Sequence, residues 1–282
     1  MAYTNTITRE HRSAYVLLLD VSGSMQDVIE SQGRKMTKGE SMVNAANQIL
    51  QELFLRAHRD NELRDYYDVA VIGYAGGEIR SLLGDGSKVF TPITELYEES
   101  NSWISLKCLT PLNAPDEVYH RSIVVDSMGS TPMHEVLYVT YGLLREWCDR
   151  PENYDSAPPM VFHITDGHAT DGDLRDIIEI SEQVMSLSTN DGNVLMLNIH
   201  LSPMMESQKL LFPTESELAA HPNAFFRTMG LASSVMPQSF TPLIHEMRGR
   251  RSNESYRGVG FNVSVVDMIS MMNIGTLSVP VR

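Results

Sequence analysis

YVLLLDVSGSMQD, residues Tyr15–Asp27, is an apolar run that ends in an aspartate and continues as a polar loop. Two serines follow Asp20 at alternate positions, Ser22 and Ser24. A continuous apolar run that stops at a polar loop is typical of a strand buried on both faces of a parallel sheet. We therefore expect a strand over Ala14–Asp20, with a carboxylate and two hydroxyls at its carboxyl end.

Further apolar runs alternate with helical patterns along the chain. Thr37 and Glu40 have the spacing of a capping box, and apolar residues then recur every three or four positions as far as His58. This alternation predicts an α/β fold with a doubly wound, mostly parallel, Rossmann-like sheet that carries helices on both faces. The other expected strands are Asp68–Ala75, a short edge strand in KVFTPI (88–93), Pro159–Thr165 and Asn193–Leu201, and the expected helices are Thr37–His58, one that starts at Pro132, and Asp173–Leu187.

The chain has 282 residues and no clear linker, so we expect a single domain over residues 1–282. Its α/β core would cover residues 14–201, with a β-hairpin-like insertion at 84–128. Residues 202–282 would form a C-terminal helical elaboration, in which several prolines separate short helices and a last strand turn precedes a final helix.

Composition argues against some classes of binding partner and favours one cellular compartment. The net charge of −14 argues against nonspecific binding to nucleic acid and against an anionic membrane surface. We see no signal-peptide pattern at the start of the sequence and no apolar run near the ~20 residues that a membrane span needs. The two cysteines, Cys108 and Cys148, form neither a metal knuckle nor a disulfide framework, which favours reduced thiols in the cytoplasm.

Oxygen donors gather in three loops that should leave the carboxyl ends of the strands, where open parallel sheets bind ligands. The loops carry Asp20, Ser22 and Ser24, then Thr131 in MGSTPM, and Asp166 in ITDGHATDGD. Such a set suits a hard cation, Mg²⁺ or Mn²⁺, and Ca²⁺ is also compatible with it. Three hydroxyls and two carboxylates are few ligands, so the ion would accept a carboxylate from outside.

These five positions resemble the metal-ion-dependent adhesion site of von Willebrand factor A (vWA) domains, in the right order along the chain. The resemblance covers about residues 14–201. It implies that Ser22, Ser24 and Thr131 ligate the ion directly, that Asp20 and Asp166 act largely through water, and that a partner protein supplies an Asp or Glu.

A weaker likeness lies near the end of the chain. LASSVMPQSF (231–240) and YRGVGFNVSVVDMISMMNIGT (256–276) are similar to stretches of bacterial cytoplasmic vWA proteins of the tellurite-resistance type. Those proteins are often encoded beside protein kinases and phosphatases. The likeness implies an adaptor in a bacterial signalling, stress-response or defence system, with a kinase or phosphatase as a candidate partner.

Two other functions remain open. In a Mg²⁺-dependent phosphohydrolase on a similar sheet, Asp20 would be the nucleophile. Such enzymes carry a second aspartate where this chain has Ser22, and they need a lysine near the phosphate, whereas the Thr131 and Asp166 loops contain none. We therefore do not expect an enzyme. In the other alternative the ion only stiffens the fold.

Several polar residues also have simpler explanations. Asp20, Ser22 and Ser24 are common loop residues, and Thr131 suits a helix N-cap. Asp171 or Gly172 should start the next helix, although Asp171 and Asp173 could instead support the metal ligands. His134 and His168 could contact a partner at the rim, and RGRRS (248–252) is either a solvated face or a docking patch.

Overall fold

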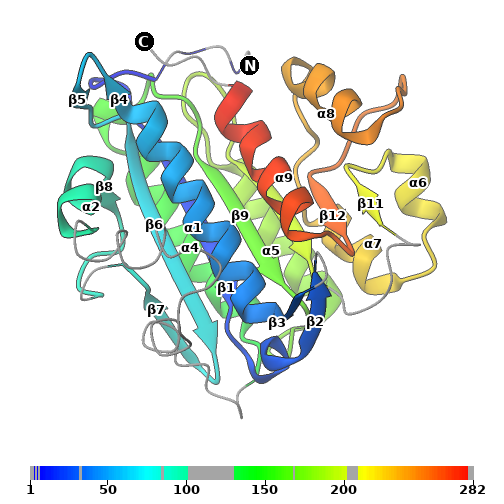
Figure 1. Ribbon diagram of the computed structural model, residues 1–282. Helices are drawn as coiled ribbons and strands as arrows, with labels where there is room; N and C mark the ends of the chain where they lie inside the picture. The colour runs from blue at the N-terminus through cyan, green and yellow to red at the C-terminus, as the bar shows by residue number, and fades with distance from the viewer. Residues whose placement is uncertain are drawn as a thin grey trace.

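The fold is a twisted central sheet with helices on both of its faces (Figure 1). We describe it from a computed structural model, whose described residues are 3, 5, 7–31, 34–83, 86–100, 130–167, 169–201 and 209–278. In this part of the chain the sheet has eight strands in the order β11-β12-β10-β9-β1-β6-β7, and β8 also pairs with β6.

The five inner strands run parallel, and the three at the edges pair antiparallel. This confirms the predicted α/β class with a mostly parallel sheet. The inner strands are β1 (Ser13–Asp20), β6 (Tyr67–Ala75), β9 (Met160–Thr165), β10 (Leu195–His200) and β12 (Val259–Phe261), and the edge strands are β7 (Glu78–Ser81), β8 (Thr91–Pro92) and β11 (Leu210–Leu211).

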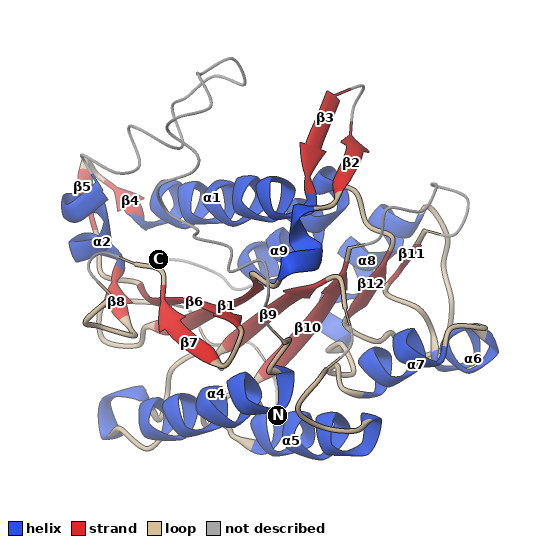
Figure 2. Cartoon of the chain, turned by 90° about the horizontal axis from the view of Figure 1, so that it is seen from below, coloured by secondary structure: helices blue, strands red, loops and turns tan. Residues whose placement is uncertain are grey.

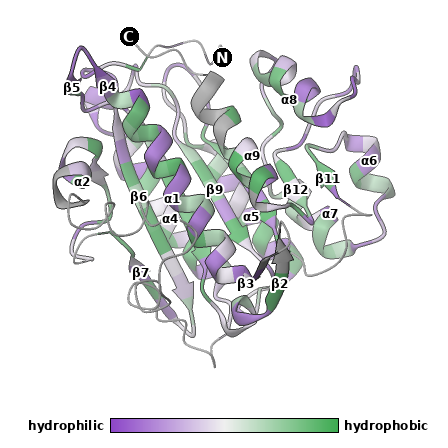
Figure 3. Ribbon diagram, viewed as in Figure 1, coloured by the Kyte–Doolittle hydropathy of each residue, from purple (hydrophilic) through white to green (hydrophobic). Residues whose placement is uncertain are grey.

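Alternating side chains of β1 explain why the sheet needs cover on both faces. Tyr15, Leu17 and Leu19 pack into one apolar core, and Ala14, Val16 and Leu18 pack into the other. The central strands are coloured mainly as hydrophobic in Figure 3. Helices α1 (Lys38–Ala57) and α9 (Val265–Ser278) cover the first face, and α4 (Met133–Cys148), α5 (Leu174–Ser186) and α7 (Ala224–Leu231) cover the second (Figure 2).

The strand order places β1 at the point where the chain changes direction across the sheet. From β1 the chain passes through α1 to β6 on one side, and it then returns through α4 to β9 on the other side. The helices that follow β1 and β9 therefore lie on opposite faces. In doubly wound sheets ligands bind at this switch point, at the carboxyl ends of the strands.

The C-terminal part continues the same sheet. β12 pairs with β10 and β11 pairs with β12, while α9 packs beside α1 (Figure 1). The short helices α6 (Glu215–Ala220) and α8 (Thr241–Arg248) lie outside these strands. In the RGRRS segment, Arg248 is no solvated charge, because its side chain is only 3% exposed and pairs with both carboxylate oxygens of Glu217.

Several predicted boundaries change. Pro132 is the N-cap of α4 and lies just before its first residue. The edge strand expected in residues 88–93 is reduced to Thr91–Pro92, and Ile93 already starts α2 (Ile93–Ser100). Of the expected insertion at 84–128, residues 84–85 and 101–128 lie outside the described residues.

The hairpins near the site follow from local sequence. Gly76 and Gly77 have φ values of 60° and 83°, which suits the two-residue turn between β6 and β7. The strands β2 (Val28–Ser31) and β3 (Arg34–Thr37) form a second hairpin that projects beside α1 (Figure 2). At the opposite end of α1, β4 (His58–Arg59) pairs with β5 (Glu62–Leu63).

A buried polar chain crosses the second face of the sheet. His163 on β9 lies between Tyr74 on β6, with an Oη–Nε2 distance of 2.6 Å, and Asn198 on β10, with an Nδ1–Oδ1 distance of 2.8 Å. The amide nitrogen of Asn198 donates to Ser233 Oγ and to the end of α7. Because the amide nitrogen is the donor of Asn198, its Oδ1 is free to accept a hydrogen bond from Nδ1–H of His163. The His163 imidazole is then neutral, and its Nε2 accepts from the Tyr74 hydroxyl. Burial lowers the pKa of His163 to about 4.

We predict that this histidine makes the fold sensitive to mild acid. An unfolded histidine takes up a proton near pH 6.5, whereas the folded His163 resists it until about pH 4, so stability falls as the pH falls between these values. The full loss would be about 3 kcal/mol in the free energy of unfolding. Urea unfolding at a series of pH values should show a flatter decline for His163→Gln, because glutamine can donate and accept but does not titrate. Equal declines in the two proteins would contradict this assignment.

Candidate metal-binding site

Asp20 is the buried anchor of the site. Its side chain ends β1 with no solvent exposure. One carboxylate oxygen accepts from the backbone amide of Ser22 at 3.0 Å, and the other accepts from Thr165 Oγ1, at the end of β9, at 2.7 Å. Burial raises the pKa of Asp20, and the hydrogen bonds from Ser22 and Thr165 act in the opposite direction. One oxygen therefore fixes the turn after β1, and the other joins β1 to the end of β9.

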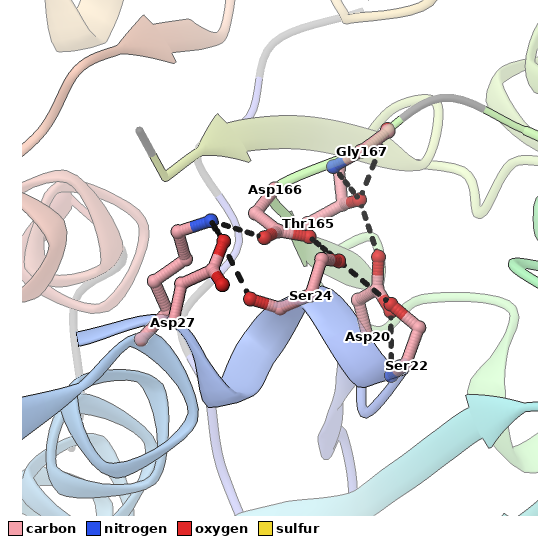
Figure 4. Close-up of polar contacts among 8 residues, drawn as sticks. Asp20, Ser22, Ser24, Asp27, Thr165, Asp166 and Gly167 are labelled. Atoms are coloured by element: carbon pink, nitrogen blue, oxygen red, sulfur yellow. Dashed lines mark hydrogen bonds and ion pairs between the residues drawn. The ribbon is translucent and has the colours of Figure 1, made fainter. Parts of the chain in front are cut away.

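Three further side chains line up beside this anchor (Figure 4). The hydroxyl oxygens of Ser22 and Ser24 are 3.2 Å apart, and Ser24 Oγ donates to Asp166 Oδ1 at 2.7 Å. Ser22 and the Asp166 side chain are buried and Ser24 is exposed, so Ser24 is the member of the row that reaches the surface. The structure thus brings together four of the five predicted site residues.

Thr131 lies at the same edge of the sheet. The residue before it, Ser130, accepts from Gly76 at the end of β6, and Thr131 exchanges two hydrogen bonds with Thr170, in the loop after β9. Since β1 lies between β6 and β9, Thr131 bridges the two strands that flank Asp20. Its hydroxyl does not cap α4, and none of its hydrogen bonds to described residues joins the other four side chains.

Lys38 is a member of the site that sequence reasoning missed. Its ammonium donates to Asp166 Oδ2 at 2.6 Å and to Asp27 Oδ2 at 2.9 Å, and it lies 3.4 Å from the Ser24 carbonyl oxygen. The Lys38 side chain is 4% exposed and that of Asp166 is 1% exposed, whereas that of Asp27 is 63% exposed. Burial lowers the pKa of Lys38, but the contacts with the two aspartates outweigh burial and raise it.

The first turn of α1 brings Lys38 to this position. Thr37 and Glu40 form the predicted capping box, which begins the helix at Lys38. The Lys38 amide donates to the Asp27 carbonyl at 3.0 Å. A Cβ atom on Gly39 would lie 3.3 Å from the Met25 carbonyl oxygen, so glycine allows the helix to pack tightly on the loop after β1.

The acidic residues after Asp166 cap helices. Asp173, and not Asp171 or Gly172 as expected, is the N-cap of α5, because its side chain accepts from two amides in the first turn. The Asp171 carboxylate accepts from two amides in the first turn of α4, those of His134 and Glu135. These bonds connect the α4 and α5 loops. The predicted rim residue His168 lies outside the described residues.

The donor set fits a small divalent cation. Neighbouring ligands around an octahedral ion with bonds of about 2.1 Å are about 3.0 Å apart. The separations of 3.2 Å between Ser22 and Ser24 and of 2.7 Å between Ser24 and Asp166 are compatible with that spacing. In the described parts of the chain no cluster of three or more His, Cys, Asp or Glu side chains is placed to hold a metal, so such a site would depend on hydroxyl ligands.

Lys38 removes one of the two objections to a phosphohydrolase. The Thr131 and Asp166 loops contain no lysine, but α1 brings the Lys38 ammonium to 2.6 Å from Asp166 Oδ2. Spacing in the sequence could not reveal this contact, because 128 positions separate Lys38 from Asp166. Thr165 was also missed, although a hydroxyl at the end of the apolar run MVFHIT (160–165) is a readable signal.

Comparisons with known proteins give a limited result. Neither a protein-family profile nor a curated relative matches the chain. Among solved structures, the chain is similar to the von Willebrand factor type A protein from Catenulispora acidiphila, with 13% identity and a TM-score of 0.38. That similarity covers 68% of this chain and 34% of the other, so the chain spans about a third of its length.

Two further solved structures show similar values. The N-terminal domain of TFIIH p34 has 12% identity and a TM-score of 0.36, over 69% of this chain and 83% of that one. The vWF domain of the type V pili tip protein Mfa5 from Porphyromonas gingivalis has 12% identity and a TM-score of 0.31, over 60% of this chain and 48% of that one. Similarity at this level assigns neither a family nor a function.

Among the helices in the described residues, none combines the length and the apolar character that a membrane crossing requires.

We predict that Thr165 stabilises the fold through its bond to Asp20. Thr165→Val keeps the shape of the side chain but leaves a buried carboxylate oxygen without its donor, which should cost about 1–3 kcal/mol. Thr165→Ser retains the hydroxyl and serves as the matched control. Chemical unfolding in the presence of EDTA measures both variants. A Thr165→Val protein that unfolds at the same denaturant concentration as wild type would contradict the prediction.

Proposed function

We propose that the chain is a metal-dependent protein–protein interaction module, an adaptor that holds Mg²⁺ or Mn²⁺ and binds an Asp or Glu of a partner through it. Asp20, Ser22, Ser24, Thr131 and Asp166 would form the site, as the resemblance to vWA adhesion sites implies. The observation that supports this proposal best is the row of oxygens Ser22–Ser24–Asp166 at the switch point of the sheet.

The chemistry of these donors favours an outside carboxylate. Hydroxyls supply oxygen ligands without cancelling the charge of the ion, and Asp20 already uses both carboxylate oxygens inside the protein. Ser24 is exposed, so the ion would be reached from its side. A bound ion of this kind stays electrophilic and has room for a further ligand. When bound, the ion would supply a Lewis-acid contact for the carboxylate of the partner.

The surroundings of the site offer a surface for the rest of such a contact. Directly after Asp27, the β2–β3 hairpin carries Val28, an apolar side chain that is 62% exposed. The hairpin projects from the body of the protein (Figure 2). A metal–carboxylate bond would give direction, and residues of this hairpin would add area and specificity.

The cellular part of the proposal rests on the likeness of the C-terminal segments to bacterial vWA proteins. It places the adaptor in the cytoplasm of a bacterium, in signalling, stress response or defence, with a kinase or phosphatase as partner. These segments run from the end of α7 towards α8 and through β12 into α9. They therefore contribute the inner strand β12, which β10 and β9 separate from β1, and the helix α9 that covers the first face.

A phosphohydrolase is the alternative, and the contact between Lys38 and Asp166 is the observation that favours it. Against it stands the environment of Asp20, the required nucleophile. Asp20 has no solvent exposure, and both of its oxygens accept hydrogen bonds from the protein. Hydrolysis of a generic phosphate ester by the purified protein with Mg²⁺, lost in Asp20→Asn, would support the enzyme over the adaptor.

We predict that Ser24 contributes to metal binding. Mn²⁺ titrated into the full chain, followed by electron paramagnetic resonance of the free ion, should give a weaker affinity for Ser24→Ala than for wild type, because one oxygen donor is lost. Ser270→Ala is the matched control, since the Ser270 hydroxyl bonds only within α9 among described residues. Wild-type protein that binds no Mn²⁺, or equal affinities in all three proteins, would contradict the site.

We also predict metal-dependent capture of a partner. Tagged wild-type protein should retain a protein from a lysate of its source organism with Mg²⁺ but not with EDTA, and Asp20→Ala should fail in both. If the melting temperature rises with Mg²⁺ while capture is the same in all conditions, the ion has a purely structural role.

A further inference from the structure

Lys38 is a buried cation at the proposed site. A lysine is rarely buried unless it is paired, because removal of an ammonium from water is costly. Lys38 is 4% exposed, and its ammonium lies 2.6 Å from the equally buried carboxylate of Asp166. Burial of an ion pair is weak evidence for a stabilising role, since desolvation can exceed the attraction. The position of this pair, on a proposed metal ligand, points to a different role.

We propose that Lys38 is a tethered cation that neutralises Asp166 when no metal is bound and so lowers the affinity of the site for a divalent ion. The inference rests on the proposed metal site and adds a regulatory element to it. The fold would keep its shape without metal because the chain supplies its own positive charge.

The two oxygens of Asp166 carry this argument. Oδ1 accepts from Ser24, so it belongs to the row of potential ligands, while Oδ2 accepts from Lys38. An ion held beside Oδ1 would therefore have an ammonium as a close neighbour across one carboxylate. Like charges at such separations repel strongly where little water screens them. Metal binding must work against this repulsion or move the ammonium away.

A second partner allows the ammonium to move. Lys38 also donates to Asp27, whose side chain is 63% exposed, and it lies near the Ser24 carbonyl oxygen. When a metal takes over Asp166, the ammonium can keep Asp27 and turn towards solvent. The lysine would then exchange between two carboxylates, and no buried charge would be left without a partner.

Lys38→Met in the full chain tests the inference, because methionine keeps much of the length of the side chain and removes the charge. Mn²⁺ should bind to Lys38→Met at least about tenfold more tightly than to wild type. In EDTA the variant should melt at a lower temperature than wild type, and Mg²⁺ should raise its melting temperature by more. Lys38→Arg, which retains the charge, should behave like wild type, and so should Lys209→Met, which removes a surface partner of Asp267.

The outcomes separate the inference from the proposed function. Equal or weaker Mn²⁺ binding by Lys38→Met, with clear binding by wild type, would overturn the inference and leave the metal site standing. If Lys38→Met binds Mn²⁺ and wild type does not, the result would support the inhibitory role of Lys38 and contradict the proposal that the native protein holds a metal. No binding by either protein would overturn both. If Lys38→Met does not fold in EDTA, recovery of its fold with Mg²⁺ supports the inference. Lys38→Gln is a second variant without the charge, and failure of both variants to fold even with Mg²⁺ overturns the inference.

Discussion

The complete burial of the Asp20 carboxylate is the constraint on which the site depends. A buried carboxylate needs hydrogen-bond donors, and Asp20 finds them in the Ser22 amide and the Thr165 hydroxyl. The first bond fixes the turn after β1, which places Ser22 and Ser24. The second ties β1 to the end of β9, so that Asp166 follows directly beside the two serines. The positions of the ligand row thus follow from the requirement to satisfy one buried group.

The sheet topology fixes the relative positions of β1 and β9, which local turns cannot fix. The helix that follows β1, α1, lies on one face of the sheet, and the helix that follows β9, α5, lies on the other. The chain therefore leaves the carboxyl ends of the two strands in opposite directions, and no single helix among the described residues covers both ends. A buried polar chain also fixes β9 relative to β6 and β10, since His163 on β9 bonds to Tyr74 and Asn198. A slip of β9 by one residue would break this chain and also move Thr165 away from Asp20. The fold and the site therefore share one register.

The sequence allowed prediction of the elements whose signal is local. The apolar runs, the capping box at Thr37 and the order of helices and strands predicted the parallel sheet. The loops at strand ends predicted that Asp20, Ser22, Ser24 and Asp166 would meet, but the hydrogen bonds of Thr131 join it to Thr170 instead. Features that depend on contacts far along the chain were not readable. Lys38 looks like an ordinary first-turn residue until α1 is packed on the loop after β1, and Asp171 looks like the start of its own helix although it caps α4.

The charges of the assembled site favour the proposed partner chemistry over a closed structural ion. Asp20 and Asp166 carry two formal negative charges, and Lys38 offsets one of them within the buried part of the site. Asp27 is mostly exposed, so water and salt screen much of its charge. A divalent ion would therefore turn a buried net charge of minus one into plus one. Without Lys38 the same ion would be neutralised by the two aspartates alone. As long as the ammonium stays beside Asp166, the remaining positive charge is one that a carboxylate from a partner would neutralise. Once the ammonium has turned towards solvent with Asp27, the ion and the two aspartates balance.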